Sequence, residues 1–176
     1  IAKAAKKEGR IASEGLIYVC KNENNASIIE VNSETDFVAR NEDFQNIVEK
    51  LGNLAIKSDN LEDLLSKEVS EESVLVKDYI TEMIASIGEN INLRRMENVE
   101  NKSGIISSYI HNQVADNMGK IGVLVSLESD EEENKLEDLG RQIAMHIAAT
   151  NPISITVEDI PKEILERERS ILEEEA

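Results

Sequence analysis

The chain has 176 residues and a formal net charge of −17, and only 3% of its residues are aromatic. So acidic a protein repels phosphate backbones and anionic lipid headgroups, which argues against nucleic acid or a membrane as a direct partner. Cys20 is the single cysteine, so an internal disulfide is excluded and a reducing compartment, the cytoplasm, is expected. No signal peptide is visible, and no apolar run approaches the roughly 18–20 residues that span a bilayer.

The first residues predict a helix followed by a β-hairpin. Residues 1–9 have the pattern of a short helix that ends at Gly9, a residue type common just past a helix C-terminus. Residues 15–21 and 26–32 are rich in Ile and Val, and the sequence NENN between them is typical of a turn. These two segments therefore predict a pair of antiparallel strands.

Three helices and a third strand are expected next. Asn41 can cap a helix with apolar residues at helical spacing, which are Phe44, Ile47, Leu51 and Leu54. A short helix is predicted over 61–67. Ser70 can cap a longer helix that ends at Gly88, and its apolar stripe contains Val76, Ile80, Met83, Ile84 and Ile87. Residues 90–96 alternate in polarity and predict a strand with Ile91 and Leu93 on one face.

The second half repeats this plan. Strands are predicted over 104–111 and 121–127, with a long turn between them, and a helix follows whose stripe is Leu136, Leu139, Ile143 and Ile147. Asn151-Pro152 ends that helix, and Pro161 suits the first turn of a final helix with an apolar stripe that lacks a partner, formed by Ile164, Leu165, Ile171 and Leu172. We predict an α+β fold of two related subdomains, each an antiparallel hairpin packed with helices.

One connection is unusual. Residues 33–41, SETDFVARN, join a predicted strand to a helix and carry Phe37 and Val38, whereas the matching connection in the second half, ESDEEEN, has no apolar residue. Connections are usually polar. Phe37 and Val38 therefore either pack beneath their own helix or form an exposed contact point for a partner protein.

Sequence motifs for catalysis are missing. The chain has no P-loop and no nucleophile-elbow motif, and neither His111 nor His146 has the neighbours of a zinc site, so no cofactor and no metal are expected. An alternative to a binding protein is a small acidic hydrolase that uses Glu34, Asp36 and His111 as acid and base groups. That alternative predicts a concave site and turnover of a small substrate.

Residues 30–44, EVNSETDFVARNEDF, resemble the signature of the elongation factor Ts family. The segments IGENINLRRM, SYIHN, GKIGVLVSLES and QIAMHIAATNP also resemble family segments, in the family's order. The resemblance implies a nucleotide-exchange factor for elongation factor Tu that performs no covalent chemistry and is not an enzyme. It also implies that the partner is contacted by residues of the TDFV segment and a strand-end histidine, which here are Thr35, Asp36, Phe37, Val38 and His111.

The resemblance further implies a division of the chain. Residues 1–9 correspond to the exit from an N-terminal helical domain, 10–101 to an N-terminal core subdomain, 102–157 to the first part of a C-terminal subdomain and 158–176 to the start of a coiled-coil arm. The chain departs from the family pattern because the N-terminal helical domain and the C-terminal part are missing. The loop 112–118 is also longer than in some members. A folded but inactive fragment therefore stays a third possibility.

Overall fold

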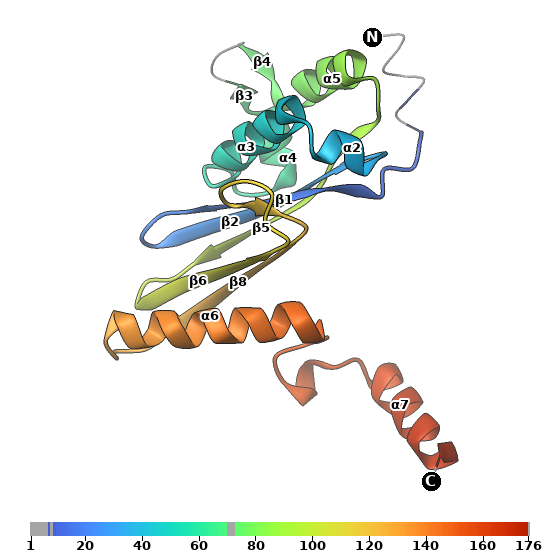
Figure 1. Cartoon of the computed structure of the whole chain (residues 1–176). Helices are drawn as coiled ribbons and strands as arrows, with labels where there is room; N and C mark the ends of the chain where they lie inside the picture. Colours follow the sequence, from blue (N-terminus) through green and yellow to red (C-terminus); the bar gives the residue numbers. More distant parts are fainter. Residues whose placement is uncertain (1–6, 8, 70–72, 176) are drawn as a thin grey trace.

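The computed structural model describes residues 7, 9–69 and 73–175 of the chain (Figure 1). The predicted helix over 1–9 lies almost entirely outside these residues, as does Ser70. In order through the molecule, a layer of helices covers one face of a central sheet, a β-hairpin lies against the other face, and one long helix covers the hairpin. The fold is thus α+β, with antiparallel sheets packed against helices.

The central sheet has four antiparallel strands in the order β5-β2-β1-β7. They are β1 (Glu14–Lys21), β2 (Asn25–Ser33), β5 (Ile91–Glu100) and β7 (Met118–Gly119). The predicted hairpin is confirmed as β1 and β2, which pair from Glu14 opposite Ser33 to Lys21 opposite Ala26. The third predicted strand is confirmed as β5, which runs beside β2.

The helices of the first half cover one face of this sheet. They are α2 (Asp36–Ala39), α3 (Glu42–Ala55), α4 (Leu61–Ser66) and α5 (Val76–Ile87). The predicted cap of α3 is confirmed, because the Asn41 side chain accepts a hydrogen bond from the Asp43 N–H at 2.7 Å. Gly88 ends α5 in the left-handed conformation that glycine adopts at low cost, as predicted.

The predicted longer helix is α5, which begins later than a cap at Ser70 would place it. A two-stranded ribbon, β3 (Glu68–Val69) and β4 (Val74–Leu75), occupies the segment before it, and the helix begins only at Val76. The β-branched pair Val69 and Val74 faces across this ribbon, a pairing that strands accommodate better than the first turn of a helix does.

The second half contains a hairpin of β6 (Gly104–His111) and β8 (Ile121–Glu128), followed by α6 (Glu133–Thr150), a short 3₁₀ turn η1 (Val157–Asp159) and α7 (Lys162–Glu175). The predicted strands and helices are confirmed. The prediction of a plain long turn between the strands is wrong, because β7 lies inside that segment and pairs with β1. This pairing joins the hairpin to the central sheet.

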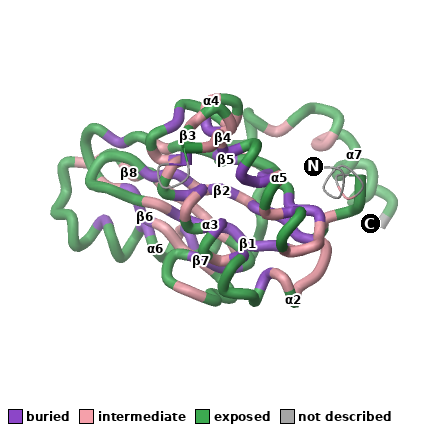
Figure 2. Tube along the Cα trace, turned by 90° about the horizontal axis from the view of Figure 1, so that it is seen from above, coloured by how far each residue is buried: buried purple, intermediate pink, exposed green. Residues whose placement is uncertain are grey.

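Burial follows from the layered arrangement. The helix-facing core includes Leu16, Tyr18, Ile29 and Val31 from the strands, while Ile17 on the opposite face of β1 is also buried because β8 packs there. Buried residues consequently concentrate in the central strands (Figure 2). Gly52 allows α3 to pack closely on β1, since a Cβ at that position would overlap the Tyr18 ring.

The predicted stripe of α6 is partly wrong. Leu139 is 49% exposed, whereas Leu136, Gly140 and Ala144 are buried against the hairpin. Gly140 determines which face of α6 packs on the hairpin, because a Cβ there would overlap the side chain of Ser107 on β6. The small residues are therefore the closest contacts, and the helix is rotated away from the larger Leu139.

Helix α7 stands apart from the layers at the C-terminal end (Figure 1). Its stripe residues Ile171 and Leu172 are 39% and 65% exposed. Of the helices within the described residues, none has the length and apolar character needed to cross a membrane.

Candidate functional site

The unusual connection forms a single helical turn. Strand β2 ends at Ser33, and α2 begins three residues later with Thr35 as its N-cap in an extended conformation. The segment that the sequence predicts as a connection is thus partly helical. Its backbone closes with bonds from the Arg40 N–H to the carbonyls of Asp36 and Phe37, both at 3.2 Å.

Helical geometry separates the two apolar side chains of this segment. Phe37 is 82% exposed, whereas Val38 is half-buried against the core and Ala39 is 1% exposed. Successive residues in a helix differ by about 100° in direction, so Val38 and Ala39 can face inward while Phe37 faces solvent. The packing interpretation is therefore correct for Val38 and wrong for Phe37.

Asp36 lies next to Phe37 on the exposed side of α2. Its carboxylate pairs with Arg40 one turn later, with Oδ2 3.1 Å from Nη2, and 44% of the Asp36 side chain is accessible. An exposed pair of this kind contributes at most about 1 kcal/mol, so a partner can replace it at little cost. The Asp36 carboxylate and the Phe37 ring are therefore both accessible on α2.

The residues before α2 are tied to the turn after α5. The Glu89 carboxylate accepts hydrogen bonds from the Thr35 N–H at 3.0 Å and from the Thr35 hydroxyl at 2.7 Å. Glu34 accepts a bond from the Asn90 N–H at 2.6 Å and lies 3.5 Å from Arg10. Sequence analysis did not identify Glu89 or Asn90, although both lie in IGENINLRRM, one of the segments that carry the resemblance.

His111 is the last residue of β6 and is exposed. Its Nδ1 lies 3.1 Å from the Tyr109 hydroxyl, and the two ring centroids are 6.1 Å apart. Residues i and i+2 of a strand share a face, which places these rings on the same side of the hairpin. The Tyr109 contact therefore orients the imidazole ring while leaving it accessible.

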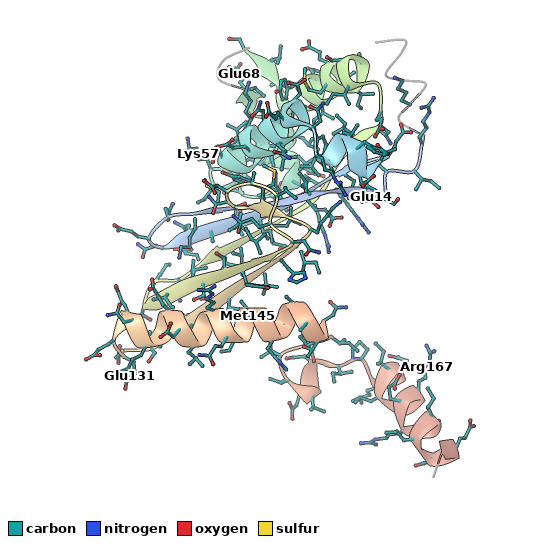
Figure 3. All side chains as sticks on the ribbon, viewed as in Figure 1. Glu14, Lys57, Glu68, Glu131, Met145 and Arg167 are labelled. Atoms are coloured by element: carbon teal, nitrogen blue, oxygen red, sulfur yellow. The ribbon has the colours of Figure 1, made fainter. Side chains whose placement is uncertain are left out.

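A short series of contacts connects His111 with the α2 region. The Lys120 N–H donates to the His111 carbonyl at 3.1 Å, and the Lys120 ammonium lies 2.9 Å from the Glu14 carboxylate. Glu14 begins β1 opposite Ser33, the last residue of β2. Figure 3 labels Glu14 at the start of β1, the strand on which α2 packs. The candidate residues are thus linked through one end of the central sheet.

The three groups of the hydrolase alternative have separate partners. Glu34 is held by Asn90, Asp36 by Arg40, and His111 by Tyr109. A cavity of about 650 Å³ lies between the central sheet and β8, and one of about 430 Å³ lies beside α5, but neither is lined by Glu34, Asp36 or His111. The concave acid–base site that this alternative predicts is not formed by these cavities.

The larger cavity has a charged edge at Glu30. Burial alone would raise the pKa of Glu30, but hydrogen bonds from Asn32 and Arg95 and the positive charges of Arg95 and Arg94 outweigh it and lower that pKa. The Arg95 Nε lies 2.6 Å from the carboxylate, so Glu30 joins β2 to β5 electrostatically. In the described part of the chain, no group of three or more His, Cys, Asp or Glu side chains could hold a metal ion.

Comparison with known proteins gives a consistent result. A family model described as elongation factor TS matches residues 34–176. Elongation factor Ts of Parvibaculum lavamentivorans is 49% identical over 177 aligned positions, which cover 100% of this chain and 58% of that protein. Elongation factor Ts of Methylobacterium radiotolerans is 48% identical over 175 positions, 99% of this chain and 57% of that protein. For the protein of the same name in Allorhizobium ampelinum the identity is 45%, with 100% and 58% coverage. The chain therefore spans less than two thirds of these relatives.

Proposed function

Because the chain belongs to the elongation factor Ts family, we propose that it acts in translation elongation as a guanine-nucleotide exchange factor for elongation factor Tu. The single observation that carries this proposal is the 82% exposure of Phe37 on a helical turn whose neighbouring residues are fixed. Interface energy is concentrated in a few aromatic or Arg side chains that fill pockets on a partner.

In the proposed mechanism, Asp36 and Phe37 insert into the GTPase beside its phosphate and magnesium site. P-loop GTPases hold the nucleotide phosphates with backbone amides, a Lys and a magnesium ion. Insertion displaces the elements that carry these groups, so the affinities for magnesium and for GDP fall together. Asp36 can exchange its weak pairing with Arg40 for a contact on the partner during this step.

Exchange follows from thermodynamic coupling. An exchange protein that lowers the affinity of the GTPase for nucleotide is itself bound more weakly when nucleotide is present. The two affinities change by the same ratio. Each 1.4 kcal/mol of coupling changes both affinities about tenfold. The incoming nucleotide therefore releases the exchange factor, and the chain needs neither a cofactor nor a covalent intermediate for this cycle.

The remaining candidate residues have supporting and secondary roles in this proposal. Thr35 and Val38 hold α2 through Glu89 and through the core, respectively. His111, exposed at the end of β6, supplies a second contact with the GTPase at the same end of the central sheet. Two separated contacts fix the orientation of the partner better than one does.

We assign the parts of the chain as the family resemblance implies. Residues 10–101 form an N-terminal core subdomain, and 102–157 form the first part of a related second one. Residues 158–176, which include the largely exposed α7, begin a coiled-coil arm, and 1–9 lead out of an N-terminal domain. The two hairpins β1–β2 and β6–β8, each followed by a long helix, support the relation between the halves. The site of action is the cytoplasm.

The test is release of a fluorescent GDP analogue from purified elongation factor Tu, followed by stopped flow. We expect this chain to accelerate release, but less efficiently than a full-length relative, because it spans 58% of the relative from Parvibaculum lavamentivorans. The deficit should appear mainly as faster dissociation from the GTPase, since related interfaces differ chiefly in off-rate. No acceleration at any concentration, together with no detectable binding, would refute the proposal for this chain.

A further inference from the structure

The register of the central sheet brings two connections together. Strand β2 ends at Ser33 directly opposite Ile91, the first residue of β5. The residues that follow Ser33 and lead into α2 therefore lie beside the residues that precede Ile91 and lead out of α5. Gly88 ends α5 just before this point, so Glu89 and Asn90 are held between a helix end and a strand start.

The two connections exchange hydrogen bonds in both directions. Glu89 accepts two bonds from Thr35, one from the backbone N–H at 3.0 Å and one from the hydroxyl at 2.7 Å. In return, Glu34 accepts the Asn90 N–H at 2.6 Å. The Asn90 side chain also donates to the Arg10 carbonyl at 2.7 Å. Hydrogen bonds to carboxylates are roughly twice as strong as bonds between neutral groups.

Helix α2 depends on these external bonds. It has four residues, far fewer than the roughly 12–15 that an isolated helix needs for marginal stability. Its N-cap residue, Thr35, makes no side-chain capping bond to the helix, and its hydroxyl donates to Glu89 instead. Val38 and Ala39 hold α2 from the core side. The Thr35–Glu89 contact is therefore the polar attachment at the start of the helix.

We propose that Glu89 is a positioning residue for nucleotide exchange, which fixes the orientation of α2 and so presents Phe37 in the conformation that the GTPase binds. This inference rests on the proposed function of the α2 segment. A contact that is already ordered before binding avoids the entropy cost of immobilising it in the complex. Loss of the contact should therefore weaken exchange while leaving the exposed Phe37 side chain chemically intact.

The central variant is Glu89→Gln. The two Thr35 bonds go to different oxygens of the Glu89 carboxylate, and an amide of the same size replaces one of these oxygens by an NH₂ donor and removes the negative charge. Glu82→Gln is the matched control, because Glu82 is exposed on α5 and carries the same charge change. Thr35→Val removes the hydroxyl donor while keeping the shape, and Thr35→Ser restores it.

A readout independent of the GTPase is available because the chain has no Trp. Phe37→Trp places a single indole on α2, and the fluorescence anisotropy of that indole reports the local mobility of the helix. The same reporter is combined with Glu89→Gln and with Glu82→Gln. Thermal melts of every variant separate a loss of local order from a loss of global stability.

We expect Glu89→Gln and Thr35→Val each to lower exchange efficiency about tenfold and to lower the anisotropy at position 37, with melting temperatures close to that of the parent chain. Glu82→Gln should behave like the parent, and Thr35→Ser should restore the anisotropy at position 37 that Thr35→Val loses. Unchanged anisotropy in Glu89→Gln overturns the inference, as does a loss of exchange that only parallels a fall in melting temperature. If the parent chain itself neither binds nor activates the GTPase, the proposed function fails, and the anisotropy measurement alone decides whether Glu89 orders α2.

Discussion

The substitution Phe37→Ala is expected to leave the fold intact and to weaken partner binding. The side chain is 82% exposed, so its removal gives up little apolar burial within the protein. Surface substitutions of this kind usually change stability by less than about 0.5 kcal/mol. The free energy of unfolding should therefore stay close to that of the parent chain.

The expected effect on binding is much larger. Complete burial of a Phe side chain in a partner contributes about 1.5–3 kcal/mol, and truncation of a residue at an interface centre costs about 2 kcal/mol or more. Because 1.4 kcal/mol corresponds to a factor of ten, the affinity for nucleotide-bound elongation factor Tu should fall roughly 30-fold. GDP release at a subsaturating concentration of the variant should slow by a similar factor.

The chain contains a matched control, since Phe44 is its only other Phe. Phe44 is 0% exposed on the buried face of α3, so Phe44→Ala should lower the free energy of unfolding by about 3–5 kcal/mol. Denaturant melts and stopped-flow GDP release are measured for both variants. A normal exchange rate for Phe37→Ala, or a loss of stability comparable to that of Phe44→Ala, would refute the role assigned to Phe37.

Three further outcomes are expected. In urea melts, Leu51→Ala should lower the free energy of unfolding by about 2–5 kcal/mol because Leu51 is 0% exposed. Leu139→Ala should lower it by less than about 0.5 kcal/mol, because Leu139 is 49% exposed. Equal losses would contradict the assigned face of α6. The pKa of Glu30 is lowered from its ordinary value of 4.5. Its ionised carboxylate therefore stabilises the fold fully above pH 4.5, and this stabilisation is lost as the pH falls through the lowered pKa. The unfolding free energy of Glu30→Gln should consequently fall less steeply in acid than that of the parent chain. His111→Ala should reduce affinity for elongation factor Tu several-fold with an unchanged melting temperature, and an unchanged affinity would remove His111 from the interface.

Most of the fold could be predicted from local patterns. The hairpin of β1 and β2, the helices α3 and α6 and the stop at Gly88 all have strong signals, because apolar periodicity, turn residues and caps act over a few positions. Membership in the elongation factor Ts family was likewise visible in short segments and is confirmed by the match over residues 34–176. Local chemistry and global fold agree at these positions.

Predictions from the sequence fail where tertiary contacts decide which structure a segment adopts. β7 has only two residues, Met118 and Gly119, and is a strand only because β1 offers a free edge there. Similarly, α6 presents Gly140 rather than Leu139 to the hairpin, because Ser107 leaves no space for a larger side chain at that crossing. No periodicity in a single segment contains this information.

At the candidate site, the sequence singles out the segment 33–41 but does not determine the orientation of its side chains. Whether Phe37 packs inward or points outward depends on the helical phase of α2, which is set by the burial of Ala39 and by the attachment of Thr35 to Glu89. Glu89 is 54 positions away from Thr35 in the chain, so no local pattern links the two residues. Their contact follows only from the register of β2 against β5.

The same register explains why an exposed Phe can be kept in place. An apolar ring on a free loop would tend to collapse onto nearby apolar surface, because burial is favourable wherever the backbone permits it. Here the backbone is held on one side by Val38 and Ala39 in the core and on the other by two bonds to Glu89. Inward rotation of Phe37 would require Ala39 to leave a site in which it is 1% exposed and Thr35 to lose a charged acceptor. The exposure of Phe37 is thus a consequence of the packing around it, which is the condition that a preorganised binding residue must meet.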